Sequence, residues 1–279
     1  MLEVGCYNCD SRDYFFYDSE NGYNYVKCNN CGLIYLNPRP DNNEITNANR
    51  NGVHKGENEI DITGDYNTEK NKNYRSIISD FYSIKELQLR NLKWLDIGCG
   101  FGEFIEVLNT YSNSRLDIIG LEPNLKKVMS CKQRNLNVDY FDIYNTDEKF
   151  DFISLLNVYS HLPNPVEYLT KVKDILTPHG ELFLETGHSS HLPPKRHHKP
   201  YYAPDHLSFA NKKIIENILE RIGFRIIKTK IYRHPQIVMK VSMKWFLILC
   251  FKLLTKKLSW RVLFPHPHGD MYIRAKKIY

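Results

Sequence analysis

The segment 92–108 constrains the fold more than any other part of the sequence. An apolar run, LKWLDI, carries an acid near its end, a glycine-rich turn follows, and EFIEVL continues with helical spacing. The turn contains Gly98, Cys99, Gly100 and Gly102. A strand that feeds such a turn and then a helix is typical of a site for a nucleotide-like ligand. Glycines let the backbone approach the ligand, and the helix N-terminus offers free N–H groups.

Two acids narrow the choice of ligand. The turn has the spacing D-x-G-x-G-x-G and not G-x-G-x-x-G, and its acid, Asp96, suits a cationic amino group and repels a pyrophosphate. S-adenosylmethionine (SAM) is such a ligand. Glu122 ends a second apolar run, 20 residues after Gly102, where a carboxylate accepts both ribose hydroxyls. Glu122 alone would also fit NAD, so the choice rests on Asp96 and the glycine spacing.

The rest of the chain predicts a doubly wound, Rossmann-like α/β sheet of seven strands. Apolar runs that alternate with helical patterns favour parallel strands. Beyond the first two, the expected strands are 138–142, 150–156, 181–186, 223–229 and 271–276, with helices over 124–134, 166–176 and 211–222. Ligands lie at the carboxyl ends of strands in such sheets. Pro123, Asp142 and Asn157 are therefore further cofactor-binding candidates, and Asp142 is placed to meet the adenine amino group.

The N-terminal segment, residues 1–40, predicts a small zinc ribbon. Two C-x2-C pairs are separated by 18 residues, a spacing typical of a tetrahedral zinc site. The ligands would be Cys6, Cys9, Cys28 and Cys31. Asn21-Gly22, between aromatic β-prone runs, predicts a hairpin. Four thiolates leave no open position, so the zinc would be structural. Unrelated or redox cysteines are the alternatives.

Residues 41–90 are expected to link the ribbon to the α/β domain that binds the cofactor. The stretch 41–64 is rich in Asn, Asp and Gly and predicts an exposed connection, whereas 66–89 has mostly helical spacing and should cover the cofactor site. The domain itself should occupy 91–279. Within it, lysines at four-residue intervals predict an amphipathic helix at about 238–258. Either packing on the domain or peripheral contact with a membrane through 240–258 would fit.

The glycine motif, the run from Phe150 to Thr186 and the cysteine pairs together resemble a known group. The chain resembles class I SAM-dependent methyltransferases, in particular bacterial members with an N-terminal zinc ribbon that act on small molecules and sugars. This resemblance implies the seven-stranded methyltransferase sheet, SAM as methyl donor and a structural zinc ion. The group often has Glu before the histidine of the loop after the fourth strand, and this chain has Ser160.

A long loop, 187–209, is the expected lid over the methyl acceptor. Five of the eleven histidines fall between 187 and 206, which marks the loop for function. His206 is the first candidate for general base because imidazole titrates near neutral pH. His161 is the second and Tyr202 a third. Ordinary structural histidines, or a catalytic metal held by this cluster, are the alternatives. The same loop carries three positively charged side chains, Lys195, Arg196 and Lys199, which favour an anionic acceptor.

Composition leaves several function classes open. A net charge of +6 and a pI near 8.8 do not by themselves imply nucleic acid. No signal-peptide or bilayer-spanning pattern is present, and closely paired cysteines fit a reducing, cytoplasmic setting. The leading hypothesis is an O- or N-methyltransferase for a sugar, polysaccharide or lipid-linked precursor. An RNA methyltransferase that uses the ribbon for binding and a non-enzymatic SAM-binding scaffold are the alternatives. Oligomeric state is not indicated.

Overall fold

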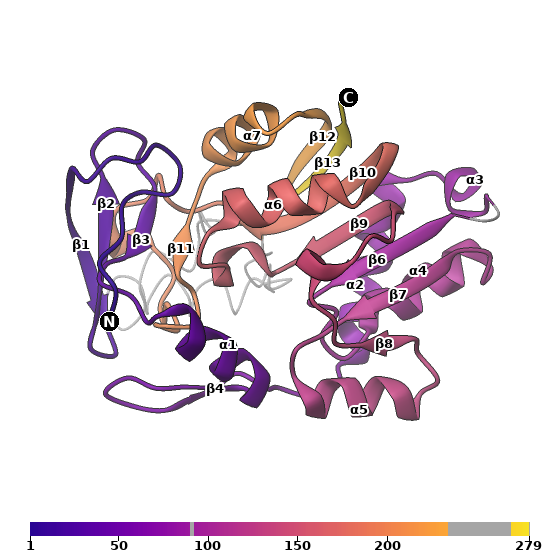
Figure 1. Cartoon of the computed structure of the whole chain (residues 1–279), viewed down its shortest axis with the longest axis horizontal. Helices are drawn as coiled ribbons and strands as arrows, with labels where there is room; N and C mark the ends of the chain where they lie inside the picture. The colour runs from indigo at the N-terminus through magenta and orange to yellow at the C-terminus, as the bar shows by residue number, and fades with distance from the viewer. Residues whose placement is uncertain (90–91, 234–268, 279) are drawn as a thin grey trace, which may run out of the picture.

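The computed structural model describes residues 1–89, 92–233 and 269–278. Two sheets dominate the described chain: a small one built around the N-terminal segment and a large central one, with a short hairpin between them (Figure 1). The amphipathic helix expected at 238–258 lies outside the described residues.

The central sheet has seven strands in the order β12-β13-β10-β9-β6-β7-β8, which confirms the predicted fold class. The strands are β6 (Lys93–Ile97), β7 (Asp117–Leu121), β8 (Val138–Asp139), β9 (Phe150–Leu156), β10 (Leu176–Gly187), β12 (Phe224–Arg233) and β13 (Gly269–Lys277). Strands β6 to β10 pair in parallel, and β13 lies antiparallel between β10 and β12. The third strand is shorter than the expected 138–142, because Asp142 instead caps a 3-10 turn over Ile143–Asn145.

Helices cover both faces of this sheet, which explains why β9 is apolar along almost its whole length. The helices of the central region are α2 (Thr68–Phe81), α3 (Ile84–Leu87), α4 (Glu103–Ser112), α5 (Leu125–Gln133), α6 (Pro165–Asp174) and α7 (Lys212–Arg221). Ile153 and Leu155 pack in one core with residues of α6 and α7. Phe152 and Leu156 face the other core, with residues of α2, α4 and α5. The alternation is that of a strand.

The N-terminal segment forms the expected hairpin but does not stand apart from the rest. Its strands are β1 (Tyr14–Glu20), β2 (Tyr23–Cys28) and β3 (Ile34–Leu36). Asn21 and Gly22 have φ of 52° and 79°, the positive values that a tight hairpin turn requires. The sheet gains a fourth strand from the predicted lid, because β11 (Ser208–Phe209) pairs with β3. The segments 1–40 and 187–209 are therefore joined by backbone hydrogen bonds.

Residues 41–64 are mostly exposed, as the sequence suggested, and they also contain regular elements. They form α1 (Asn42–Asn51) and a hairpin of β4 (Val53–His54) and β5 (Ile60–Asp61). Asp41 and Glu44 make a reciprocal capping box, a signal that was present in the sequence. Figure 1 shows α1 and β4 between the small sheet and α5. Two 3-10 turns, Tyr159–His161 and Pro194–Arg196, complete the described elements. No described helix has the length and apolarity needed to cross a bilayer.

Candidate functional site

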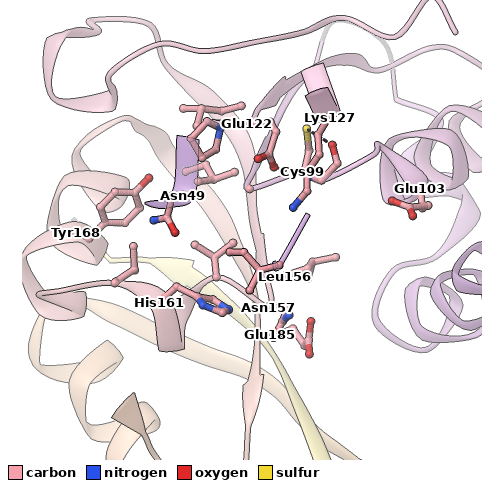
Figure 2. Close-up of a pocket in the computed structure, with 18 of the residues that line it drawn as sticks. Asn49, Cys99, Glu103, Glu122, Lys127, Leu156, Asn157, His161, Tyr168 and Glu185 are labelled. Carbon is pink, nitrogen blue, oxygen red and sulfur yellow. Dashed lines mark hydrogen bonds between the residues drawn. The ribbon is translucent and has the colours of Figure 1, made fainter. Parts of the chain in front are cut away.

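A cavity of about 740 Å³ opens where the central strands end, within the range of about 300–1,000 Å³ common for small-ligand sites. Its wall comes from the glycine turn after β6, the residues after β7 and β9, the end of β10, and α1 and α2. Figure 2 shows Glu122, His161, Glu185 and Asn157 around this space. The cavity thus lies where the sequence predicted a ligand site, at the carboxyl ends of the parallel strands.

The glycine turn brings backbone close to the cavity. Gly98, Cys99 and Gly100 all line it. Gly98 has φ of 67°, and a Cβ there would lie 2.4 Å from Cγ2 of Val158 in the loop after β9. Only glycine therefore allows the two loops to approach each other. Gly102 stands outside the wall as the N-cap of α4, with φ of 80°.

Asp96 lies under the turn and not in the wall. Its side chain is buried and accepts a hydrogen bond of 2.6 Å from Oγ of Ser154, which itself receives one from Nε1 of Trp94. Burial raises the pKa of Asp96 to about 7, against the effect of the Ser154 bond. The Asp96 carboxyl thus bonds to Ser154 of the neighbouring strand β9, and its expected contact with a ligand amino group stays a prediction.

Glu122, the residue expected to bind ribose hydroxyls, lies in the cavity wall. Its two oxygens accept the backbone N–H groups of Gly100 and Asn124, each at 2.9 Å. Burial raises the pKa of Glu122, while Lys127 and the two N–H groups oppose that rise. A carboxylate has about four lone-pair sites, so two remain for hydroxyl donors of a ligand. Pro123, Asp142 and Asn157 also line the cavity, as expected.

Besides Asp205, which contacts His161, three further acids in the wall were not singled out from the sequence. Glu103 is buried and accepts the backbone N–H of Asn67 at 3.2 Å. Glu185 lies two residues before the end of β10, and burial, with the charge of Asp270, raises its pKa to about 8. Asp270 lines the same wall. Glu103 directly follows the glycine turn and Glu185 is the next-to-last residue of the predicted strand 181–186, so both positions were visible in the sequence.

Of the three proposed catalytic residues, His161 alone lines the cavity. Its Nδ1 lies 2.9 Å from Oδ1 of Asp205 and 3.0 Å from the Asp205 carbonyl oxygen. Burial works against the charged ring, but the charge and hydrogen bonds of Asp205 outweigh it and raise the pKa of His161. Because Nδ1 is engaged, Nε2 is the nitrogen left for a ligand in the cavity.

His206 and Tyr202 stand outside the cavity wall. The His206 ring lies 4.5 Å from the His161 ring, between centroids, and its Nδ1 contacts Oγ of Ser160 at 2.8 Å. Burial and the charge of His161 lower the pKa of His206 to about 3. Tyr202 is largely exposed, with its ring 6.4 Å from that of His206. The sequence preferred His206 over His161, but of the two it is His161 that lines the cavity.

His161, Asp205 and His206 also stand near enough to one another to hold a metal ion, with one ligand atom from each within 4.8 Å of the others. Each imidazole Nδ1 already has a partner, however: Asp205 for His161 and Ser160 for His206. Hydrogen bonds thus already engage the Nδ1 atoms of both histidines.

The cationic centre of the 187–209 loop is directed elsewhere. Nζ of Lys199 pairs with Asp18 of β1 at 2.7 Å. None of the three loop cations, Lys195, Arg196 and Lys199, lines the cavity. The loop is held on the small sheet by Tyr201, whose hydroxyl donates to Asp18 at 2.6 Å. The charges that favoured an anionic acceptor thus do not reach the wall.

The four N-terminal cysteines converge as predicted. Sγ atoms of Cys6 and Cys31 lie 3.4 Å apart, those of Cys9 and Cys28 3.5 Å, and all four lie within 4.8 Å of one another. These distances are far above a disulfide bond of about 2.05 Å. They approach the S···S separation of about 3.8 Å that tetrahedral Zn–S bonds of about 2.3 Å require. The donor set fits a structural zinc ion.

Comparison with known proteins agrees with this geometry. A methyltransferase-domain family matches residues 66–229, more than half of the chain. A tRNA U34 carboxymethyltransferase of Pseudomonas fluorescens is 32% identical over 111 residues, which cover 36% of this chain and 34% of that protein. A ubiquinone biosynthesis O-methyltransferase of Cereibacter sphaeroides is 28% identical over 109 residues, covering 36% and 43%. The chain thus spans well under half the length of these relatives.

Among solved structures, a SAM-dependent methyltransferase from Archaeoglobus fulgidus aligns with a TM-score of 0.50 and 23% identity. The alignment covers 74% of this chain and 94% of that one. At this identity the likeness shows the fold alone. The family match extends from the start of α2 to β12 and includes the glycine turn, Glu122 and His161. By this match, the chain belongs to the methyltransferase-domain family.

Proposed function

We propose that the protein is a SAM-dependent methyltransferase that transfers a methyl group to an oxygen or nitrogen atom of a small-molecule acceptor. The observation that carries the proposal is Glu122, a buried carboxylate in the cavity wall, beside a glycine turn that exposes backbone to the same cavity. This pairing matches a ligand with ribose hydroxyls, and the D-x-G-x-G-x-G spacing of the turn favours SAM over a dinucleotide. Family membership supports the same reading.

Bound beside Glu122 and the glycine turn, SAM would supply an electrophilic methyl group, which the lone pair of the acceptor would take while the electron pair of the C–S bond stays on sulfur. The acceptor loses a proton, and Nε2 of His161 is the group placed to receive it. Asp205 stabilises the resulting imidazolium through Nδ1. Alignment of the reacting atoms by the cavity supplies the rest of the acceleration.

The charges of the wall support an acceptor that is neutral or basic. Its acids are Glu103, Glu122, Asp142, Glu185, Asp205 and Asp270, and its basic side chains are Lys70, Lys127 and His161. Glu185, with a pKa of about 8, is largely protonated at neutral pH, but the other five acids still outnumber the three basic side chains, and the loop cations that favoured an anionic acceptor lie elsewhere. We therefore propose a hydroxyl- or amine-bearing acceptor of sugar-like polarity, free or as part of a polysaccharide or lipid-linked precursor. A cytoplasmic location and a structural zinc ion complete the proposal.

RNA is the second candidate, because one relative is named a tRNA carboxymethyltransferase. The other named relative is an O-methyltransferase of ubiquinone biosynthesis. In this chain the loop after β9 reads Asn157-Val158-Tyr159-Ser160, without the proline-rich turn that stacks a flipped base. We therefore favour the small molecule.

The test has two steps. Calorimetry with S-adenosylhomocysteine (SAH) should show one site per chain, and NAD should not bind. Incubation with methyl-labelled SAM and either bulk tRNA or a small-molecule extract should then label the small-molecule fraction. Label in tRNA would instead select the RNA candidate. Binding of SAH without label in either pool would favour the scaffold alternative, and absence of SAH binding would remove the methyltransferase assignment.

A further inference from the structure

His54 is buried deep in the molecule with a polar nitrogen aimed at the candidate site. It ends β4, is 2% exposed, and its Nε2 lies 3.2 Å from Oδ1 of Asp205. This is the same oxygen that Nδ1 of His161 contacts at 2.9 Å. Among the described residues Nε2 has no other polar partner, and its approach to Asp205 does not meet hydrogen-bond geometry. Buried imidazole nitrogens normally have a partner, so this contact needs an explanation.

Asp205 needs a second support to keep its orientation. It lies in an irregular loop, and the terminal torsion of an aspartate is broad, so one contact leaves the carboxylate plane poorly defined. Among the described residues the side-chain contacts of this carboxylate are His161 and His54. Burial disfavours its charge, but His161 and His54 outweigh that and hold the pKa of Asp205 well below its usual range. The carboxylate is therefore an anion between two imidazoles.

The strand that carries His54 is fixed on the cofactor side of the cavity. Gly52, just before β4, has φ of 76°, and a Cβ there would lie 2.1 Å from Oγ1 of Thr63 and 2.8 Å from Nδ2 of Asn124. Asn124 caps α5 and follows Glu122 by two residues. The N–H of Ile62 donates to the Gly52 carbonyl at 2.8 Å. This close packing makes β4 a firm support.

We propose that His54 is a positioning residue for methyl transfer: it holds Asp205 from the β4 side, so that the carboxylate keeps His161 turned with Nε2 toward the acceptor. The proposal rests on the function proposed above. His54 touches neither acceptor nor methyl donor and acts only through Asp205. It also connects the acceptor side of the cavity to the strand end that carries Glu122.

The test observes His161 directly and does not need the acceptor. Histidine-labelled (¹⁵N) protein is titrated by NMR in the wild type and in His54→Phe, His54→Gln, Asp205→Asn and, as a control, His198→Gln at an exposed loop position. The groups that influence His161 are Asp205 and His206 on the loop, His54, Glu185 near the end of β10, and Lys127 on α5. The two His54 substitutions and Asp205→Asn change the His54–Asp205 contact, whereas the control His198→Gln does not.

In the wild type, neutral His161 should carry its proton on Nδ1, as the Asp205 contact requires. His54→Phe should raise the fraction protonated on Nε2 and move the pKa of His161 down toward the ordinary value of about 6.5. Asp205→Asn should produce the same two changes, whereas His198→Gln should produce neither. His54→Gln, which keeps a side-chain donor, should retain most of the wild-type tautomer.

The proposal is overturned if folded His54→Phe keeps both the wild-type tautomer and the wild-type titration of His161. Should that variant fail to fold, the wild-type spectrum decides: Nε2–H of His54 must exchange slowly with water because it is buried against Asp205, and rapid exchange would refute the contact. Calorimetry with SAH on the same samples is separate. If the wild-type protein does not bind SAH, the methyltransferase function is refuted, whatever the spectra of His54 and His161 show.

Discussion

Glu122→Gln isolates the carboxylate that the proposed function depends on most. Both oxygens already accept backbone N–H groups, from Gly100 and Asn124 at 2.9 Å. Glutamine has a single acceptor oxygen, so its amide nitrogen must face either one of these N–H donors or a ligand hydroxyl, which is also a donor. One charge-assisted hydrogen bond to the ligand is therefore lost.

The expected cost to SAH affinity is about 1.5–3 kcal/mol, or roughly 10–150-fold in Kd, the range for hydrogen bonds to charged groups. The free protein should also lose about 1–3 kcal/mol of stability, because one buried backbone N–H loses its acceptor. Calorimetry with SAH and thermal unfolding measure the two effects. Glu59→Gln makes the same chemical change at an exposed position without a hydrogen bond among the described contacts, and should leave both quantities unchanged.

A Glu122→Gln protein that folds normally and binds SAH within twofold of the wild type would refute this reasoning. Asp96→Asn sharpens the comparison. Asp96 lies under the turn and bonds to Ser154, so its effect on SAH should be smaller than that of Glu122→Gln. If Asp96→Asn instead weakened SAH more, the direct contact expected from the sequence would be restored.

Other outcomes follow from the acceptor side and the cysteine cluster. His161→Ala should reduce turnover by about 10²–10⁴-fold with SAH affinity unchanged, and His206→Ala should cost less, because only His161 reaches the cavity; equal losses would argue against that ranking. The base must be neutral to accept a proton, and Asp205 raises the pKa of His161, so turnover should rise with pH through a value above the ordinary histidine pKa; a pH-independent rate would contradict this. Metal analysis should find one zinc per chain and none in Cys28→Ser; two metals would point to a second site.

Local patterns were enough to predict that the glycine turn and Glu122 border one cavity. The turn at 98–102 and the acid at Glu122 lie next to the strands that position them, and strand ends in a parallel sheet meet at one edge. Asp96 was the exception. An acid in a strand faces one side or the other with period two, and a sequence alone does not show that Ser154 on the neighbouring strand takes up its carboxyl group.

The acceptor half was harder to predict because its residues come from irregular segments far apart in the sequence. His54, His161 and Asp205 lie on a short hairpin, a 3-10 turn and a loop. No periodicity relates them. The proximity of histidines in the 187–209 loop favoured His206, yet in an irregular loop successive side chains point in different directions. Its neighbour Asp205 reaches the wall, and His206 does not.

The N-terminal segment contacts the loops around His161 and His206, so it is more than a separate ribbon on a linker. A zinc ribbon joined by a linker could be removed without effect on catalysis, but here Tyr25 donates its hydroxyl to the carbonyl of His206 at 2.7 Å. Tyr7 contacts the hydroxyls of Tyr159 and Ser208 at 3.1 and 3.0 Å, next to the turn that carries His161. Tyr25 lies in β2 of the hairpin, and Tyr7 lies between Cys6 and Cys9. Metal at the four cysteines would thus stabilise the surface on which the His161–Asp205 pair is built, while Glu122 and the glycine turn depend on the central sheet.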